Sequence, residues 1–117
     1  MAPNDWLLVQ LETPYAGDVE FNVKFARACM RDCLLRGEAP FASHLLYTQE
    51  GVLNDLIQDE RRLGISAGLA WGGLAQKTVV YTNLGMTPGM RIGIERAQLQ
   101  GRRVQYRRLE GWQSGAE

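Results

Sequence analysis

At 117 residues, with 45% hydrophobic and 22% charged side chains, the chain has the composition of one globular domain that can build a core without disulfides. Lysine and arginine together number 13, as do aspartate and glutamate, so the net charge gives no attraction to nucleic acid or to a membrane surface. Two cysteines and one histidine cannot complete a closed zinc site without carboxylates, and no apolar run approaches the ~20 residues that span a bilayer.

The chain begins with a predicted strand, a loop and a helix. The apolar run "DWLLVQLE" (5–12) indicates a buried strand, and "TPYAGD" (13–18) indicates a loop. Apolar residues then recur at helical spacing from Val19 to Cys33, and Gly37 is well placed to end this helix. This is the best-defined helix in the sequence.

The same helix carries both cysteines, Cys29 and Cys33, four residues apart. We expect both to face inward as small apolar residues rather than to form a redox or metal pair. No basic-then-apolar leader opens the sequence. A reducing, cytoplasmic setting without cofactor or metal is therefore expected.

The middle of the chain is predicted to form a strand, a loop, a helix and a further strand. "APFASHLL" (39–46) is the second predicted strand, and a polar loop (47–55) follows it. A helix is expected from Asp55 or Gln58 to Ala75, although each glycine inside it costs up to ~1 kcal/mol relative to alanine. Close approach of the helix backbone to the sheet or to a second subunit would compensate. "KTVVYTN" (77–83) is the third predicted strand.

The last helix is predicted to begin with Thr87 as its N-cap and Pro88 at its first position. Gly101 ends it, and "RRVQYRRL" (102–109) gives a fourth strand. The arginines of this strand either protect a sheet edge or form a patch for phosphate or nucleic acid, and we favour the edge. Residues 1–110 are predicted to form one domain, and residues 111–117 a flexible tail.

Strands that alternate with helices through short connections predict an α/β fold with right-handed crossovers and a parallel sheet. Ligands bind such sheets beyond the carboxyl ends of the strands, where the strand order switches. The loops 12–18, 44–55 and 82–89 and the residues from 109 onward should therefore form the site.

Each of these loops offers candidate side chains with an alternative structural role. Tyr15 could stack on a base or a sugar, or could cover the sheet edge. Asp18 is more readily explained as a helix cap. A single histidine is often structural, but His44 lies at the carboxyl end of a predicted strand, so a functional role is also open. Asp55 could belong to a site, or to the acidic first turn of a helix that the helix dipole favours.

The helix that starts at Thr87 could present its N-terminus to an anion or a polar ligand. The sequence nevertheless lacks the dinucleotide-binding pattern of glycines after the first strand, and it has no Walker-type lysine. The loop therefore predicts a polar ligand without identifying it.

Three stretches together resemble the nucleoside 2-deoxyribosyltransferases, and in particular small uncharacterised bacterial and phage domains grouped with them. They are "ETPYAGDVEFNVKFARACMRDCLLRGEAPFASHLLYTQ", "ERRLGISAGLAW" and "MTPGMRIGIERAQLQGRRVQY". The likeness covers residues 7 to 108. It implies a Rossmann-like, three-layer α/β/α fold with four to five parallel strands, a nucleoside or nucleotide pocket, and a homodimer or larger assembly.

Active members of this group cleave N-glycosidic bonds with a glutamate near the start of a helix, which attacks the anomeric carbon. The alignment places Gly93 where that glutamate would lie. Glu95 follows two residues later, about 200° around the helix, and cannot serve from the opposite face. A shift in the register of the helix start, or a different carboxylate such as Glu12 or Asp55, could restore the chemistry. Lys77 lies near the place of an aspartate that the group often keeps.

We therefore predict a nucleoside- or nucleotide-type binding protein with impaired catalysis, which could sequester a nucleotide signal or metabolite. The alternatives are an N-glycosidase or nucleoside deoxyribosyltransferase acting through Glu95 or Glu12, and an oligomeric interaction module that uses the glycine-rich helix around Trp71. The predicted ligand-binding residues are Thr13, Pro14, Tyr15, Asp18, Asn22, His44, Tyr47, Asn83, Met86, Thr87, Gly89, Met90 and Arg91.

Overall fold

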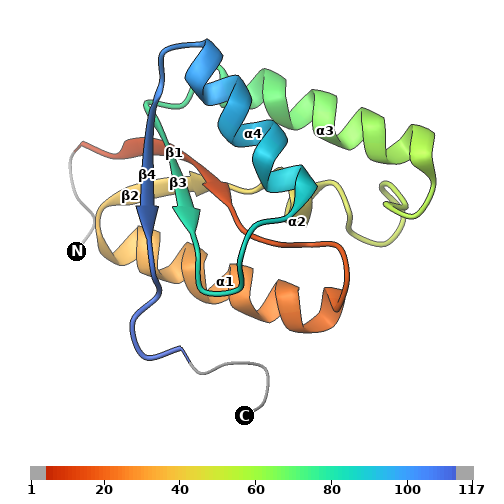
Figure 1. Cartoon of the computed structure of the whole chain (residues 1–117), viewed down its shortest axis with the longest axis horizontal. Helices are drawn as coiled ribbons and strands as arrows, with labels where there is room; N and C mark the ends of the chain where they lie inside the picture. The colour runs from red at the N-terminus through yellow and green to blue at the C-terminus, as the bar shows by residue number, and fades with distance from the viewer. Residues whose placement is uncertain (1–4, 113–117) are drawn as a thin grey trace.

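Four parallel strands form a single sheet in the order β2-β1-β3-β4. The computed structural model describes residues 5–112. The strands are β1 (Leu7–Glu12), β2 (Glu38–Phe41), β3 (Lys77–Tyr81) and β4 (Arg103–Arg107). The helices are α1 (Val19–Leu35), α2 (Ser43–Leu46), α3 (Gln58–Gly72) and α4 (Pro88–Leu99). Figure 1 shows α1 on one side of the sheet and α3 and α4 on the other, so the predicted Rossmann-like three-layer fold is confirmed.

The strand order switches direction at β1, because β2 pairs with one side of this strand and β3 with the other. In an open parallel sheet, the carboxyl end of such a strand opens into a crevice between neighbouring crossovers. Glu12 is the last residue of β1 and pairs with Val80 of β3. The end of β1 is therefore the place to look for a site.

The α1 side of the sheet holds the larger apolar core. Val9 and Leu11 of β1 pack there with Phe25, Cys29 and Cys33 of α1. Both cysteines are fully buried and free, so the inward orientation expected for them is confirmed. Burial raises the pKa of the Cys33 thiol to about 11, and the hydrogen bond with Tyr81 and the charge of Arg107 offset this only in part, so Cys33 remains a neutral thiol.

The α3 and α4 side has a smaller apolar core and closer backbone contacts. Val80, Met90 and Ile94 form this core. A methyl group at Gly72 would collide with the side chain of Gln10, and one at Gly93 would collide with Glu12. The close approach to the sheet that was expected to compensate for the glycines of α3 is therefore present at Gly72.

The second strand is shorter than predicted, and the error concerns the site. β2 ends at Phe41, and residues 43–46 form the short helix α2 instead of continuing the strand. Sheet pairing stops at the Phe41–Gln10 pair, and the N–H groups of Leu45 and Leu46 both donate to the Ala42 carbonyl. This turn carries the chain away from the sheet over the end of β1.

The third and fourth strands also end early, at Tyr81 and Arg107. Beyond these strands, hydrogen bonds from a side chain replace the backbone hydrogen bonds of the sheet. Asn83 Nδ2 donates to the Leu109 carbonyl, and the Leu109 N–H donates to Asn83 Oδ1. α3 begins at Gln58, the later of the two predicted starts, and ends at Gly72 rather than at Ala75.

The arginines of β4 do not all protect the sheet edge. β4 is an edge strand, but Arg107 points inward and donates to both carboxylate oxygens of Glu38 at 2.9 and 2.8 Å. Lys77 Nζ lies 2.9 Å from the same carboxylate. Burial alone would raise the pKa of Glu38, but the hydrogen bonds from Arg107 and Lys77 outweigh it and lower this pKa to about 2. A buried ion cluster therefore links β2, β3 and β4.

The end of the described chain packs against α1. The ring of Trp112, which lies in the predicted tail, is 5.2 Å from that of Phe25 and 6.0 Å from that of Phe21, measured between centroids. The rest of the predicted tail, 113–117, lies outside the described residues. Within residues 5–112, no helix is both long and apolar enough to cross a membrane.

Candidate functional site

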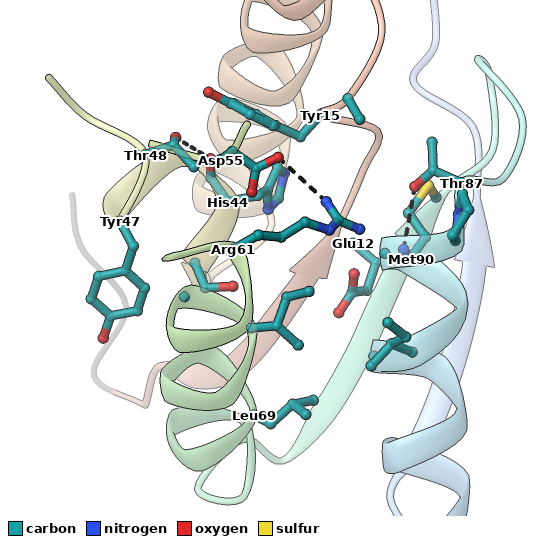
Figure 2. Close-up of a pocket in the computed structure, with 18 of the residues that line it drawn as sticks. Glu12, Tyr15, His44, Tyr47, Thr48, Asp55, Arg61, Leu69, Thr87 and Met90 are labelled. Carbon is teal, nitrogen blue, oxygen red and sulfur yellow. Dashed lines mark hydrogen bonds and ion pairs between the residues drawn. The ribbon is translucent and has the colours of Figure 1, made fainter. Parts of the chain in front are cut away.

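A cavity of about 200 Å³ opens between α3 and α4, above the carboxyl end of β1. Its floor comes from β1, and its rim comes from the loop after β1, from α2, and from the loop before α3. Figure 2 shows Glu12 and Arg61 in the space between the two helices, whereas the ring of Tyr47 points away from it. The switch in strand order and the cavity therefore coincide, as the topology predicts.

Glu12 lies on the floor of the cavity, only 8% exposed. Burial raises the pKa of its carboxyl group to about 8, and the charge of Arg102 offsets this only in part. No hydrogen bond to this carboxyl group is present among residues 5–112. At neutral pH, Glu12 is therefore mainly a neutral carboxylic acid, able to donate one hydrogen bond and accept another.

Gln10 extends the floor toward the C-terminal end of α3. It is 4% exposed, and its Oε1 atom has no hydrogen-bond partner in the described part of the chain. Buried polar groups in folded proteins are nearly always hydrogen-bonded. The Gln10 Oε1 atom is packed against Gly72 of α3, so Glu12, two residues further along the same face of β1, is the polar floor group that faces the cavity.

The short helix α2 carries His44 and places it at the rim of the cavity. The His44 Nε2 and Thr13 Oγ1 atoms are 2.6 Å apart, and the His44 ring meets the edge of Tyr15 at a centroid distance of 6.4 Å. Burial lowers the pKa of His44 to about 4, so its imidazole is neutral at physiological pH. His44 can therefore position Thr13 or contact a ligand, but it carries no charge for an anion.

Arg61 crosses the opening of the cavity from α3 toward the first turn of α4, as Figure 2 shows. Its Nη1 atom lies 3.3 Å from Asp55 Oδ2, and its Nη2 atom would be 3.8 Å from a methyl group placed at Gly89. At the start of α4, Thr87 Oγ1 accepts from the Met90 N–H. The ion pair with Asp55 holds Arg61 over the cavity and compensates its charge.

The walls of the cavity are apolar. Ile65 and Leu69 line it from α3, and Met90 and Ile92 line it from α4. Apolar walls with a few polar groups at one end are typical of small-molecule sites. Within residues 5–112, no group of three or more His, Cys, Asp or Glu side chains is arranged to hold a metal ion.

The sequence matches, over residues 7–107, the family described as "Domain of unknown function (DUF7768)". The chain belongs to this family. No curated protein matches it. Among solved structures it is similar to a 2-deoxyribosyltransferase from the psychrotolerant bacterium Bacillus psychrosaccharolyticus, with a TM-score of 0.62 and 15% identity over 93% of this chain and 77% of that one. That protein is described as a biocatalyst for the synthesis of antiviral and antitumoral nucleosides, and the likeness shows that the two proteins share a fold.

The cavity of this DUF7768 chain includes about half of the site residues predicted from the sequence. Those that line it are Glu12, Thr13, Tyr15, His44, Tyr47, Thr87, Gly89 and Met90. They come from segments far apart in the sequence, which the parallel sheet gathers at one edge. Whether they contact a ligand stays a prediction.

The other predicted residues lie outside the cavity lining, and several have structural roles. Asp18 caps α1 by accepting from the Phe21 N–H. The Asn22 side chain donates to the carbonyls of Tyr15 and Ala16, so it shapes the loop that carries Tyr15. Pro14 is buried in that same loop.

The remaining four predicted residues are also absent from the cavity lining. Asn83 bonds to the backbone of Leu109, and Met86 packs beside the apolar core of α4. Arg91 and Glu95 are exposed, and no ion pair joins them among the described residues. Glu95 thus faces away from the cavity, as its position on the helix predicted.

Arg61 and Gln10 line the cavity but were not predicted from the sequence. Arg61 lies one turn into a predicted helix, and the loop before this helix contains an acidic residue. This position could have indicated Arg61 as a site residue, but the path of the loop decides where its side chain points. Gln10 alternates with apolar residues in β1, and a polar residue inside a buried strand could have indicated it.

Proposed function

We propose that this chain binds a nucleoside- or nucleotide-type small molecule in the cavity between α3 and α4. The observation that carries the proposal is the buried carboxyl group of Glu12, which has no hydrogen-bond partner among residues 5–112 and lies on the floor of a cavity with apolar walls. A bound ring with donors and acceptors on its edge would supply the missing hydrogen bonds of this carboxyl group.

The shape of the site supports this class of ligand. The aliphatic walls from α3 and α4 face each other across the cavity and suit the faces of a flat ring. Thr13, Tyr15 and His44 at the rim offer hydroxyl and imidazole groups suited to a sugar. The shared fold with a 2-deoxyribosyltransferase adds support, because that protein acts in nucleoside synthesis.

We further propose that binding, rather than turnover, is the main activity of the site. Gly93 has no side chain, and the Glu12 carboxyl group occupies the space that a side chain there would need. Attack on an anomeric carbon requires an ionised carboxylate. With its pKa raised to about 8, Glu12 is mostly protonated at neutral pH. Sequestration of a nucleotide signal, for instance in a phage setting, would need only this binding.

An N-glycosidase acting through Glu12 is the second candidate, and the contact between Glu12 and Gly93 is the observation in its favour. A carboxylate at this place would lie between both helices at the cavity floor. Base release by such an enzyme would rise with pH through about 8, as Glu12 loses its proton.

Two measurements test these proposals. A thermal-shift panel of nucleosides, nucleoside monophosphates and ADP-ribose should include at least one stabilising compound, and no shift with any of them would refute the binding function. Release of free base, followed by chromatography between pH 6 and pH 9, separates binding from catalysis. Steady turnover at pH 7 that is lost in Glu12→Gln would show that binding is not the main activity.

We also propose self-association through α3. Leu63, Trp71 and Leu74 are 62%, 55% and 67% exposed, which is unusual for large apolar side chains close together in sequence. Sedimentation of the wild type and of Trp71→Lys measures this directly. A wild-type monomer at every concentration would refute it.

A further inference from the structure

A second, wider hollow adjoins the cavity on its outer side. It has a volume of about 680 Å³ and lies between residues 15–19, which lead into α1, and residues 48–56, which precede α3. We call it the outer groove, and the cavity between α3 and α4 the inner cavity. Six residues line both: Tyr15, Ala16, Thr48, Leu53, Asp55 and Glu60. The two hollows therefore adjoin one another along these six side chains.

The size of the inner cavity indicates that it holds only part of a ligand. Its 200 Å³ is below the ~300 Å³ at the lower end of pockets that enclose a drug-sized molecule. Arg61, fixed by Asp55, narrows its opening. A ring in the inner cavity would place its polar edge on Glu12, and the remainder of the ligand would then extend toward the outer groove.

The charges of the outer groove restrict what that remainder can be. Glu50, Asp55 and Glu60 line it, and no lysine or arginine does so within residues 5–112. Arg61 neutralises Asp55, and Glu60 accepts a hydrogen bond from the Asn54 N–H. Glu50 is exposed and takes part in no ion pair among the described residues. The groove thus carries uncompensated negative charge.

An aromatic ring adds to the preference of the outer groove for a positively charged group. Tyr15 forms part of the wall that the two hollows share, beside Asp55 and Glu60. A cationic group gains from the uncompensated carboxylates of the groove and from an aromatic face, whereas a phosphate is repelled by these carboxylates. The carboxyl group of Glu12, buried in the floor of the inner cavity without a hydrogen-bond partner among residues 5–112, indicates independently that this site takes a ligand.

We propose that the ligand has two parts: a ring held in the inner cavity, and an amine-bearing part, not a phosphate, held in the outer groove. This inference rests on the proposed binding of nucleoside-type molecules and adds the chemistry of their second half. The ligand class is then an amino-substituted nucleoside, or a nucleoside joined to a cationic group.

The test uses the full chain and matched ligands measured by calorimetry. For one purine and one pyrimidine, the series comprises the free nucleoside, its 5′-monophosphate, its 5′-amino-5′-deoxy analogue, and an analogue with an aminoethyl group on the base. The two amine positions cover both orientations of the ligand. At least one amine should bind roughly tenfold more tightly than its parent nucleoside, and the monophosphate more weakly. This advantage should shrink as salt rises from roughly 20 mM to roughly 300 mM, because exposed charges are screened.

Variants assign the effect to the groove. Glu50→Lys should abolish the preference for the amine, because it reverses the uncompensated charge. Glu95→Lys makes the same change of charge on the exposed side of α4 and should leave the preference intact. If both variants reduced the preference for the amine equally, the preference would come from the overall charge of the protein and not from the outer groove.

The outcomes separate this inference from the proposed function. If the parent nucleosides bind but the monophosphate binds most tightly, or no amine binds more tightly than its parent, the two-part ligand is wrong and the nucleoside site stands. If no compound of the series binds, both are wrong.

Discussion

The carboxyl group of Glu12 should make the protein less stable as pH rises, and Glu12→Gln should remove this effect. Burial raises the pKa of Glu12 from 4.5 to about 8. Between these values the unfolded chain has released a proton that the folded chain still holds. Because the folded state then binds more protons, the free energy of unfolding falls with rising pH across this window.

The size of the effect follows from the width of the window. Each pH unit inside it costs about 1.4 kcal/mol, so the wild type should lose about 2.7 kcal/mol from this group between about pH 5 and about pH 7. Glutamine keeps the shape of the side chain and its hydrogen-bonding capacity but cannot ionise. A loss of this size is a large fraction of the ~5–15 kcal/mol that stabilises a typical domain.

Urea unfolding between pH 5 and pH 8, followed by tryptophan fluorescence, measures the difference between Glu12→Gln and the wild type. Effects of all other titrating groups cancel in this difference, which should grow in favour of the variant as pH rises. Glu95→Gln, on the exposed side of α4, is the matched control and should stay within about 0.5 kcal/mol of the wild type. A Glu12→Gln difference that does not change with pH would mean that water reaches the carboxyl group, and that the cavity floor is not sealed.

The remaining predictions concern packing, the buried ion cluster and the rim. Gly93→Ala should cost about 1–3 kcal/mol and abolish ligand-induced thermal shifts, because its methyl group would collide with the carboxyl group on the cavity floor. Gly89→Ala, whose nearest neighbouring atom would be 3.8 Å away, is the control and should fold normally. Arg107→Ala should lower the free energy of unfolding by about 3–5 kcal/mol, since it leaves a buried carboxylate without its main partner. Because the pKa of Glu38 is lowered to about 2, its stabilisation should be present above about pH 4.5 and disappear toward pH 2, which acid unfolding followed by circular dichroism can check. As pH falls from about 6.5 to about 4, the wild-type imidazole of His44 stays neutral in the folded state while the unfolded chain takes up a proton, so the free energy of unfolding should fall. His44→Gln should reduce this loss. An equal loss in the variant and the wild type, measured by urea unfolding, would show that His44 is solvated.

The layers and the parallel sheet could be predicted from the sequence because their signals are local. Apolar runs of strand length alternate with helical periodicity, and the caps at Thr87 and Gly37 mark helix ends through side-chain chemistry and backbone freedom. The convergence of the loops then follows from topology alone. These elements needed no knowledge of long-range contacts.

What the sequence could not predict depends on contacts between distant segments. The apolar run at 43–46 fits a strand or a helix, and only the end of sheet pairing at Phe41 decides between them. The inward path of Arg107 depends on Glu38, 69 residues away. Glu12 was considered as a replacement for a missing carboxylate, but its contact with Gly93 arises only when α4 packs on the end of β1.

The ion cluster that joins β2 to β4 has a consequence for synthesis of the chain. The carboxylate of Glu38 is made 69 residues before its bidentate arginine, Arg107, and leaves the ribosome well ahead of it. Until β4 emerges, the nascent sheet holds a buried acid with only Lys77 beside it. Since contacts between such distant residues delay folding, this domain should commit to its native state only after β4 has emerged, and truncation before β4 should yield a protease-sensitive product.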